Sequence, residues 1–165
     1  MESDKLKLLQ RMPIFGGVSP AALEFLLERA VGVEIAAGDP FFREGDSGTS
    51  AYVLETGRVS IVKHWKGSDY HLRDLQAGDC FGEVALFDFG NRSASVHAVE
   101  DCAALELSAA SLYALSNDHL QQFAIVYMNL GREVARRLRV ADDRLFQAKV
   151  ERVDALVDGY RFASA

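Results

Sequence analysis

Hydrophobic and polar positions along the chain divide it into a helical beginning, a strand-rich middle and a helical end. Leucines from Leu6 onward indicate a first helix, which Pro13 ends because proline cannot continue the hydrogen-bond ladder. Ser19 and Pro20 form a helix start signal, with serine as the cap and proline in the first turn. Apolar residues follow at helical spacing, so the pattern predicts an amphipathic helix from Pro20 to about Ala30.

The middle of the chain consists of short β-rich runs separated by glycine-containing turns. The runs are Val33–Ile35, Phe41–Phe42, Ala51–Leu54, Val59–Val62, Tyr70–Leu72, Ala94–Val99 and Ala104–Leu107. Many short strands at close spacing indicate a sandwich, a jelly roll or a barrel. Parallel strands joined by crossover helices are excluded, because no helix-length segment separates these runs.

The pattern returns to helix after the last of these runs. Ser108 is expected to cap a short helix to about Leu115, and a long helix is predicted from about His119 to beyond Ala148. Apolar or small residues recur three and four apart along it, at Gly131, Val134, Leu138, Ala141, Leu145 and Ala148. This heptad seam predicts a symmetric homodimer through residues 119–148. The alternative is a helix that packs on its own domain.

The three parts predict one domain with an appended helix. We expect an N-terminal helical segment, a β core, C-terminal helices and a frayed tail, with boundaries at 1–31, 32–107, 108–158 and 159–165. The length of 165 residues is enough to bury a core without disulfides or metal.

Composition and charge narrow the class of protein. The chain is 49% hydrophobic and 25% charged, which is typical of a globular protein. Its net charge of -6 argues against a general nucleic-acid surface or a polybasic membrane surface. The sequence has neither a signal peptide nor an apolar run of about 20 residues, so we expect a cytoplasmic protein with no membrane contact.

Cysteines and histidines give little support for metal chemistry. Cys80 and Cys102 are too few for a four-cysteine site, and we expect two buried thiols. A metal-dependent jelly-roll enzyme needs clustered histidines, whereas the four here are scattered, at His64, His71, His97 and His119. Hydrolase and nucleoside-triphosphate motifs are also missing, so the sequence predicts no enzyme and no cofactor. A remote alternative is a haem or redox sensor that uses Cys80 or His97.

The most informative stretch lies between the fifth and sixth β-rich runs. Gly82 lets the backbone approach a ligand closely, and Glu83 to Phe87 can form one helical turn with free amide groups. Arg92 adds a permanently charged fork of donors, and Ser93 adds a hydroxyl. Together with Glu83 as an acceptor for a sugar hydroxyl, these groups fit a ribose-phosphate. The alternative is a surface ion pair between Glu83 and Arg92 on a turn.

This stretch resembles the phosphate-binding cassette of cyclic nucleotide-binding domains. These are the sensor domains of the catabolite activator protein family, of cyclic-AMP-dependent kinase regulatory subunits and of cyclic-nucleotide-gated channels. The match is Gly82-Glu83-x-Ala85-Leu86, five residues, then Arg92-Ser93-Ala94-x-Val96-x-Ala98. The resemblance extends over about Leu8 to Leu145. It implies a mainly β fold with flanking helices, a double-stranded β-helix jelly roll, plus a long C-terminal dimerisation helix.

The resemblance also implies roles for individual residues. Glu83 would accept a hydrogen bond from the ribose 2′-hydroxyl, Arg92 would pair with the cyclic phosphate, and Ser93 would assist through its hydroxyl and amide. Backbone amides of the cassette would cap the phosphate, and two strand residues would wall the sugar and base. The full set of expected ligand-binding residues is Gly82, Glu83, Val84, Ala85, Arg92, Ser93, Ala94, Ile61, Leu72, Ala141 and Asp142.

The long helix departs from the family pattern at Ala141 and Asp142. A catabolite-activator relative has a Thr-Ser pair here that contacts adenine across the dimer seam, and alanine has no hydroxyl to give. The resemblance therefore leaves base selection open at these two positions. It favours cAMP at Ser93, where many cyclic-GMP binders have threonine. The residues after Lys149 are too few for a helix-turn-helix domain, so we expect no direct DNA binding by this chain.

The resulting hypothesis is a regulatory module that binds a cyclic nucleotide, cAMP or cGMP. Binding would reorder the cassette and shift the hinge between Leu107 and His119, which would reposition the long helix toward an unknown downstream partner. The alternative is a degenerate interaction module that keeps the fold and the dimer seam but binds no nucleotide.

Overall fold

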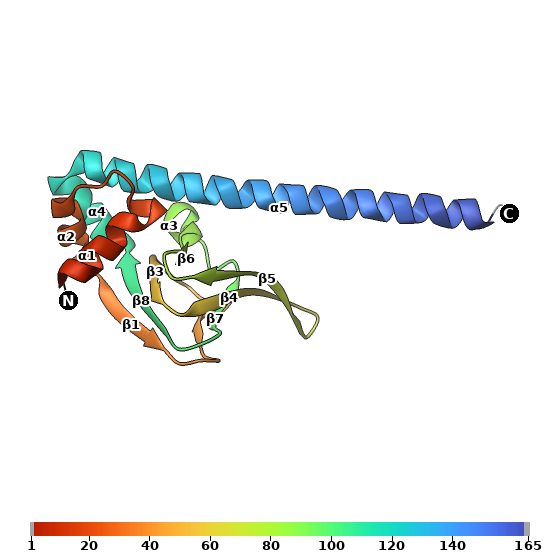
Figure 1. Ribbon diagram of the computed structural model, residues 1–165, viewed down its shortest axis with the longest axis horizontal. Helices are drawn as coiled ribbons and strands as arrows, with labels where there is room; N and C mark the ends of the chain where they lie inside the picture. Colours follow the sequence, from red (N-terminus) through yellow and green to blue (C-terminus); the bar gives the residue numbers. More distant parts are fainter. Residues whose placement is uncertain (1, 164–165) are drawn as a thin grey trace. The chain divides into compact units, whose positions relative to one another are not determined.

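The computed structural model describes the backbone of residues 2–163 and the side chains of residues 5–153. Within these residues, eight strands form two four-stranded antiparallel sheets (Figure 1). The strand orders are β1-β8-β3-β6 and β2-β7-β4-β5. The strands are β1 (Val31–Ile35), β2 (Pro40–Phe42), β3 (Ser50–Thr56), β4 (Arg58–Trp65), β5 (Ser68–Gln76), β6 (Cys80–Phe81), β7 (Ser95–Ala98) and β8 (Cys102–Ser108).

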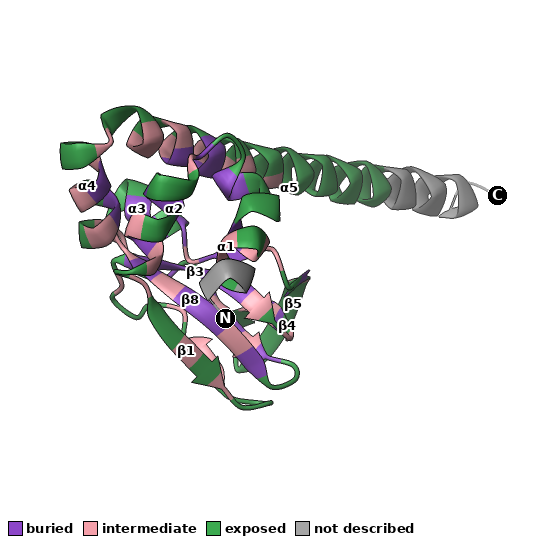
Figure 2. Cartoon of the chain, turned by 60° about the vertical axis from the view of Figure 1, so that its left-hand side comes forward, coloured by how far each residue is buried: buried purple, intermediate pink, exposed green. Residues whose placement is uncertain are grey.

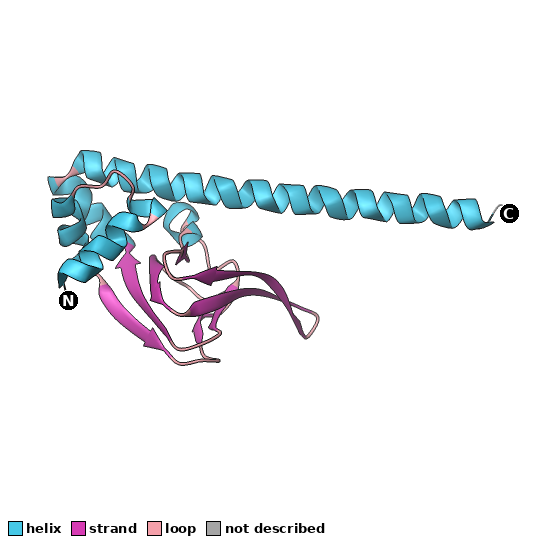
Figure 3. Cartoon of the chain, viewed as in Figure 1, coloured by secondary structure: helices cyan, strands magenta, loops and turns pink. Residues whose placement is uncertain are grey.

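Helices precede, interrupt and follow the strands (Figure 3). They are α1 (Glu2–Arg11), the short 3-10 helix η1 (Pro13–Phe15), α2 (Pro20–Leu27), α3 (Val84–Asp88), α4 (Ala109–Asp118) and α5 (Leu120–Ala163). The chain divides into two compact units, Met1–Leu130 and Gly131–Ala165. None of the helices in the described part of the chain combines the length and the apolar character that crossing a membrane requires.

Both predicted serine caps are confirmed. The Ser19 hydroxyl accepts a hydrogen bond from the Ala22 amide at 3.3 Å, and α2 begins at the following proline. The Ser108 hydroxyl accepts one from the Ser111 amide at 3.0 Å, and α4 follows. In each case the side chain satisfies an amide that the first helical turn leaves unpaired.

Most element boundaries differ from the prediction by a few residues, and three of the differences have a local physical reason. Helix α2 ends at Leu27 rather than at Ala30, because the amides of Arg29 and Ala30 bond three residues back, as in a tighter turn. Strand β6 was not predicted, since two residues are too short to show an alternating pattern. Helix α5 continues to Ala163, past the predicted start of a tail at 159, because a glycine alone does not end a helix.

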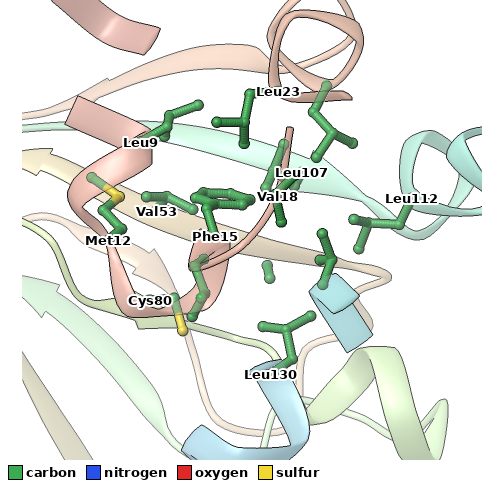
Figure 4. Packing of buried hydrophobic residues seen from close by; sticks show 14 of the residues in the cluster. Leu9, Met12, Phe15, Val18, Leu23, Val53, Cys80, Leu107, Leu112 and Leu130 are labelled. Atoms are coloured by element: carbon green, nitrogen blue, oxygen red, sulfur yellow. The ribbon is translucent and has the colours of Figure 1, made fainter. Parts of the chain in front are cut away.

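Two hydrophobic clusters lie on opposite faces of β3. Ala51 and Val53 belong to the cluster between the β1-β8-β3-β6 sheet and the helices, where Phe15 is almost fully buried (Figure 4). Tyr52 and Leu54 belong to the second cluster, which draws residues from both sheets. Alternate side chains of a strand point to opposite faces, so β3 forms part of both clusters.

The second unit is the later part of α5, and its side chains are all exposed from residue 138 to residue 153 (Figure 2). Gly131, Glu133, Val134 and Arg137, at its beginning, are partly buried. Leu138 is 60% exposed and Leu145 is 55% exposed. Glu133 pairs with Arg136 at 2.6 Å and with Arg137 at 2.7 Å, three and four residues further along the helix. The predicted seam therefore presents large apolar side chains to solvent.

Candidate functional site

The segment between β6 and β7 brings Gly82 next to Arg92. Gly82 has a φ of +75°, a left-handed conformation that favours glycine. A Cβ added here would lie 2.7 Å from Arg92 Nη1 and 3.2 Å from the Ser50 carbonyl oxygen. The position therefore needs glycine both for its backbone angle and for the space that the arginine occupies.

The Arg92 side chain is buried, with 5% of its surface exposed. Its Nη1 donates to the carbonyl oxygens of Ser50 at 2.7 Å and Gly82 at 3.0 Å, and its Nη2 donates to the Ser50 hydroxyl at 3.2 Å. A guanidinium has five N–H groups, so these bonds leave two of them. One of the two belongs to Nε, which is buried and has no hydrogen-bond partner.

Aromatic rings and a bare backbone enclose the guanidinium. Arg92 Cζ lies 4.2 Å from the centroid of the Phe42 ring and 5.7 Å from that of Tyr52, at cation–π distances. A Cβ on Gly48 would approach Arg92 Nε to 2.4 Å, so the loop before β3 can contact the guanidinium only because residue 48 is glycine. This close packing holds the charge in one place.

A cavity of about 510 Å³ borders the arginine. Phe41, Phe42, Asp46, Gly48, Tyr52 and Glu106 line it together with Arg92 and Ser50. Of the predicted ligand residues in the described part of the chain, only Arg92 lines this cavity. Arg92 was predicted to bind the phosphate, whereas the sequence analysis did not assign the other lining residues to the site.

Glu83 is also buried, with 2% of its surface exposed. It stands directly before α3, and its carbonyl oxygen accepts from the Leu86 amide at 3.0 Å. The predicted helical turn is therefore present as α3, a helix of five residues. Because Glu83 and Arg92 are both buried, the alternative of a surface ion pair on a turn is wrong.

The other expected ligand residues lie in varied surroundings. Ala85 and Ala94 are buried, whereas Ser93 is exposed and Val84 is 37% exposed. Ile61 and Ala94 belong to the second hydrophobic cluster, the one between the sheets.

Leu72 is 42% exposed and lies on β5, a strand that pairs with β4. Ala141 and Asp142 lie on the exposed part of α5 in the second unit. The ligand contacts expected of all these residues stay predictions.

The sequence analysis missed several residues that line the cavity beside Arg92, among them Phe42, Ser50, Tyr52 and Glu106. Phe42 and Tyr52 belong to β-rich runs that the sequence predicted, but the strand pattern alone gave them no role in the site. Nor did the sequence assign Ser50 and Glu106, because they are 56 residues apart and meet only through the pairing of β3 with β8.

Both cysteines are buried, as predicted, and two of the histidines form ion pairs on the surface. Cys80 and Cys102 are free and buried, and burial raises the pKa of the Cys102 thiol. His64 pairs with Asp69 at 2.9 Å and His71 with Asp74 at 2.8 Å, both on the exposed β4–β5 hairpin. Among the described side chains, no three metal-binding residues form a cluster.

The two antiparallel sheets form a β jelly roll. Helices flank it, and the long helix α5 follows it, an arrangement found in ligand-sensing domains. The family model of the cyclic nucleotide-binding domain matches residues 32–119, more than half of the chain. The chain belongs to the cyclic nucleotide-binding domain family, which confirms the resemblance and the predicted fold class.

The relatives of this chain include a cyclic AMP receptor protein and a transcriptional regulator. The cyclic AMP receptor protein of Thermus thermophilus is 36% identical over 131 residues, which cover 79% of this chain and 59% of that protein. The CRP-like cAMP-activated global transcriptional regulator of Mycobacterium tuberculosis is 29% identical, covering 84% and 61%. The chain therefore spans less than two thirds of the length of these relatives.

Solved structures agree with this assignment. The Thermus thermophilus catabolite activator protein has a TM-score of 0.71 at 36% identity, covering 81% of this chain and 61% of that one. The regulatory domain of Toxoplasma gondii PKA, crystallised with cAMP, has a TM-score of 0.64 at 26% identity, covering 68% and 43%.

Proposed function

We propose that this chain is a regulatory module that binds a cyclic nucleotide, with cAMP preferred, and that it has no enzymatic activity. In this proposal Arg92 pairs with the cyclic phosphate, and Glu83 accepts from the ribose 2′-hydroxyl. Ser93 and the backbone amides from Gly82 to Ala85 complete the phosphate site. The names of the relatives support cAMP as the ligand, since one is a cyclic AMP receptor protein and another is a cAMP-activated transcriptional regulator.

The proposal depends above all on the buried Nε of Arg92. A buried donor without a partner costs roughly 1–3 kcal/mol, more when it carries charge. This Nε–H and the second N–H of Nη2 lie on the same edge of the guanidinium, the edge that pairs with two oxygens of a phosphate. A cyclic phosphate monoanion would satisfy both donors and balance the buried charge.

Isothermal titration with cAMP and cGMP tests this function directly. Arg92→Ala is expected to weaken cAMP binding by about 2–5 kcal/mol, which is about 30-fold to several thousand-fold in Kd. The matched control is Arg43→Ala, which removes the same charge from an exposed position in the segment before β3. Equal affinity of wild type and Arg92→Ala would overturn the proposed phosphate contact.

We extend the proposal to signal transmission and assembly. The exposed seam of α5 is the proposed homodimer interface, because Leu138 and Leu145 recur seven residues apart and leave a large apolar surface in water. His119, between α4 and α5, has φ -139° and ψ 57°, so the helical backbone is interrupted at the expected hinge. A change at the cassette would move α5 about this point and so alter a downstream partner in the cytoplasm.

The second candidate function is an interaction module without a nucleotide. One observation favours it: Arg92 already donates three hydrogen bonds to its own chain. Thermal unfolding separates the two candidates, because a ligand at a hundred times its Kd stabilises the folded state by about 2.7 kcal/mol. A higher unfolding temperature with cAMP or cGMP supports the sensor, and unchanged unfolding with both supports the interaction module.

A further inference from the structure

Glu106, on β8, binds two hydroxyl groups that adjoin the arginine. Its Oε1 accepts from the Ser50 hydroxyl at 2.6 Å and from the Tyr52 hydroxyl at 3.1 Å. Both hydroxyls come from β3, which pairs with β8 so that Tyr52 stands opposite Glu106. The carboxylate also lines the cavity beside Arg92.

The bond to Glu106 determines what the Ser50 hydroxyl can do for Arg92. A serine hydroxyl has one hydrogen to donate and two lone pairs to accept with. Glu106, as a carboxylate, can only accept, so the hydroxyl hydrogen points toward it. The lone pairs of Ser50 Oγ are then free for Arg92 Nη2, which donates to this oxygen at 3.2 Å.

Glu106 also places a negative charge one hydroxyl away from a buried guanidinium. The three bonds that Arg92 makes within the chain go to neutral oxygens, two carbonyls and one hydroxyl. A buried cation with only neutral partners is unfavourable, and a carboxylate linked through a hydrogen-bonded chain reduces that cost. The same chain fixes the position of Nη2, and with it the edge that Nη2 shares with the unpartnered Nε.

We infer that Glu106 is a positioning residue of the binding site, which acts through Ser50 to orient the Nε–Nη2 edge of Arg92 toward the phosphate of the ligand. The inference rests on the proposed function, because it concerns how the same arginine is held. Glu106 makes no contact with the ligand in this scheme. Its effect on affinity requires the Ser50 hydroxyl.

Glu106→Gln tests the scheme at nearly constant size. A glutamine amide can donate to Ser50 Oγ, which turns the hydroxyl hydrogen toward the arginine and removes the bond to Nη2. We expect cAMP affinity to fall roughly tenfold, the change typical of one lost bond to a charged group. Glu34→Gln is the matched control, because it removes the same charge from an exposed residue of β1.

A double-mutant cycle with Ser50→Ala separates positioning from a general structural effect. If Glu106 acts through Ser50, Glu106→Gln weakens binding in the wild-type background and changes it less than twofold in Ser50→Ala. An equal loss in both backgrounds, no loss in either, or tighter binding by Glu106→Gln overturns the inference. If Glu106→Gln does not fold, Ser50→Ala alone decides, with an expected loss of the same size and an unchanged affinity as the contrary result.

Failure of the inference is distinguishable from failure of the proposed function. Wild-type protein that binds neither cAMP nor cGMP contradicts the proposed function and the inference with it. Wild-type protein that binds cAMP, together with a Glu106→Gln variant of equal affinity, contradicts the inference alone. Unfolding in urea without ligand shows for each variant that the fold is retained.

Discussion

The Phe87 ring on α3 meets the Tyr127 ring on α5 edge to face, with centroids 5.6 Å apart and an interplanar angle of 74°. Tyr127 in turn contacts Phe123 on the same helix, with ring centroids 4.5 Å apart. Helix α3 follows directly after Glu83, so the aromatic pair connects the cassette to the beginning of α5. A movement of α3 on ligand binding would reach α5 through this contact.

Phe87→Ala is expected to lower the free energy of unfolding by about 0.5–1.5 kcal/mol beyond the loss from buried area, because an edge-to-face pair is removed. The measurement is urea unfolding of the ligand-free protein. Phe89→Ala is the control, since Phe89 is 81% exposed and lies just after the same helix. A Phe89 variant destabilised as much as the Phe87 variant would show that the ring pair is unimportant.

Gly82→Ala and Gly67→Ala separate two reasons for glycine. Both residues have positive φ, +75° and +80°, so an alanine at either position costs about 1–2 kcal/mol of stability. Around Gly67 an added Cβ meets nothing within 4 Å, whereas at Gly82 it meets the arginine. We therefore expect both variants to unfold more easily and only Gly82→Ala to lose cAMP affinity in titration calorimetry. Similar affinities for the two variants would contradict the close fit around Arg92.

Stability is expected to fall in alkaline solution because of two tyrosines, Tyr52, which is buried, and Tyr127, which is partly buried. Burial raises the pKa of Tyr52 and of Tyr127 above the ordinary value of 10.0. The unfolded chain then loses these protons at lower pH than the folded chain, so stability is complete below about pH 10 and decreases as pH rises through the folded pKa. Urea unfolding between about pH 9 and about pH 11 measures the slope. Tyr127→Phe should reduce the dependence of the free energy of unfolding on pH. An unchanged dependence would mean that other groups cause it.

Lysine substitutions in the seam of α5 test whether it is a dimer interface. Leu138→Lys or Leu145→Lys is expected to give a monomer at tens of micromolar protein in light scattering, because each substitution places a charge in the proposed dimer interface. Phe146→Lys is the control, as Phe146 is 68% exposed but lies about 100° around the helix from Leu145. A wild-type monomer at this concentration, or equal dissociation by all three variants, would reject the seam.

Much of this molecule was predictable because local signals agree with the final fold. Serine caps, glycine turns and short β-rich runs depend on neighbouring residues, and these predictions match the structure within a few residues. Arg92 was predicted as a site residue because its motif is long and specific. Its burial confirms an inward-facing side chain, although the pattern gave no indication of the bonds to Ser50 and Gly82.

The rest of the site depends on strand register, which the sequence does not reveal. Ser50 and Glu106 meet because β3 and β8 pair in one particular alignment, and a shift by one residue would turn each side chain to the opposite face. A similar limit applies to Ile61, where a bulge before Val62 changes the alignment of β4 with β5. Long-range pairing of this kind appears only in the folded chain.

Strand β3 borders two clusters, and this limits the ways in which the domain can respond to a ligand. A shift of β3 by one residue along its neighbours would turn every side chain to the opposite face and disrupt both clusters. The sheet is therefore expected to stay rigid. Any response has to come from parts that can rotate or tilt without breaking the ladder. In the proposed sensor, the sheets would therefore form a rigid frame, and the response to a ligand would come from helices that move about their hinges.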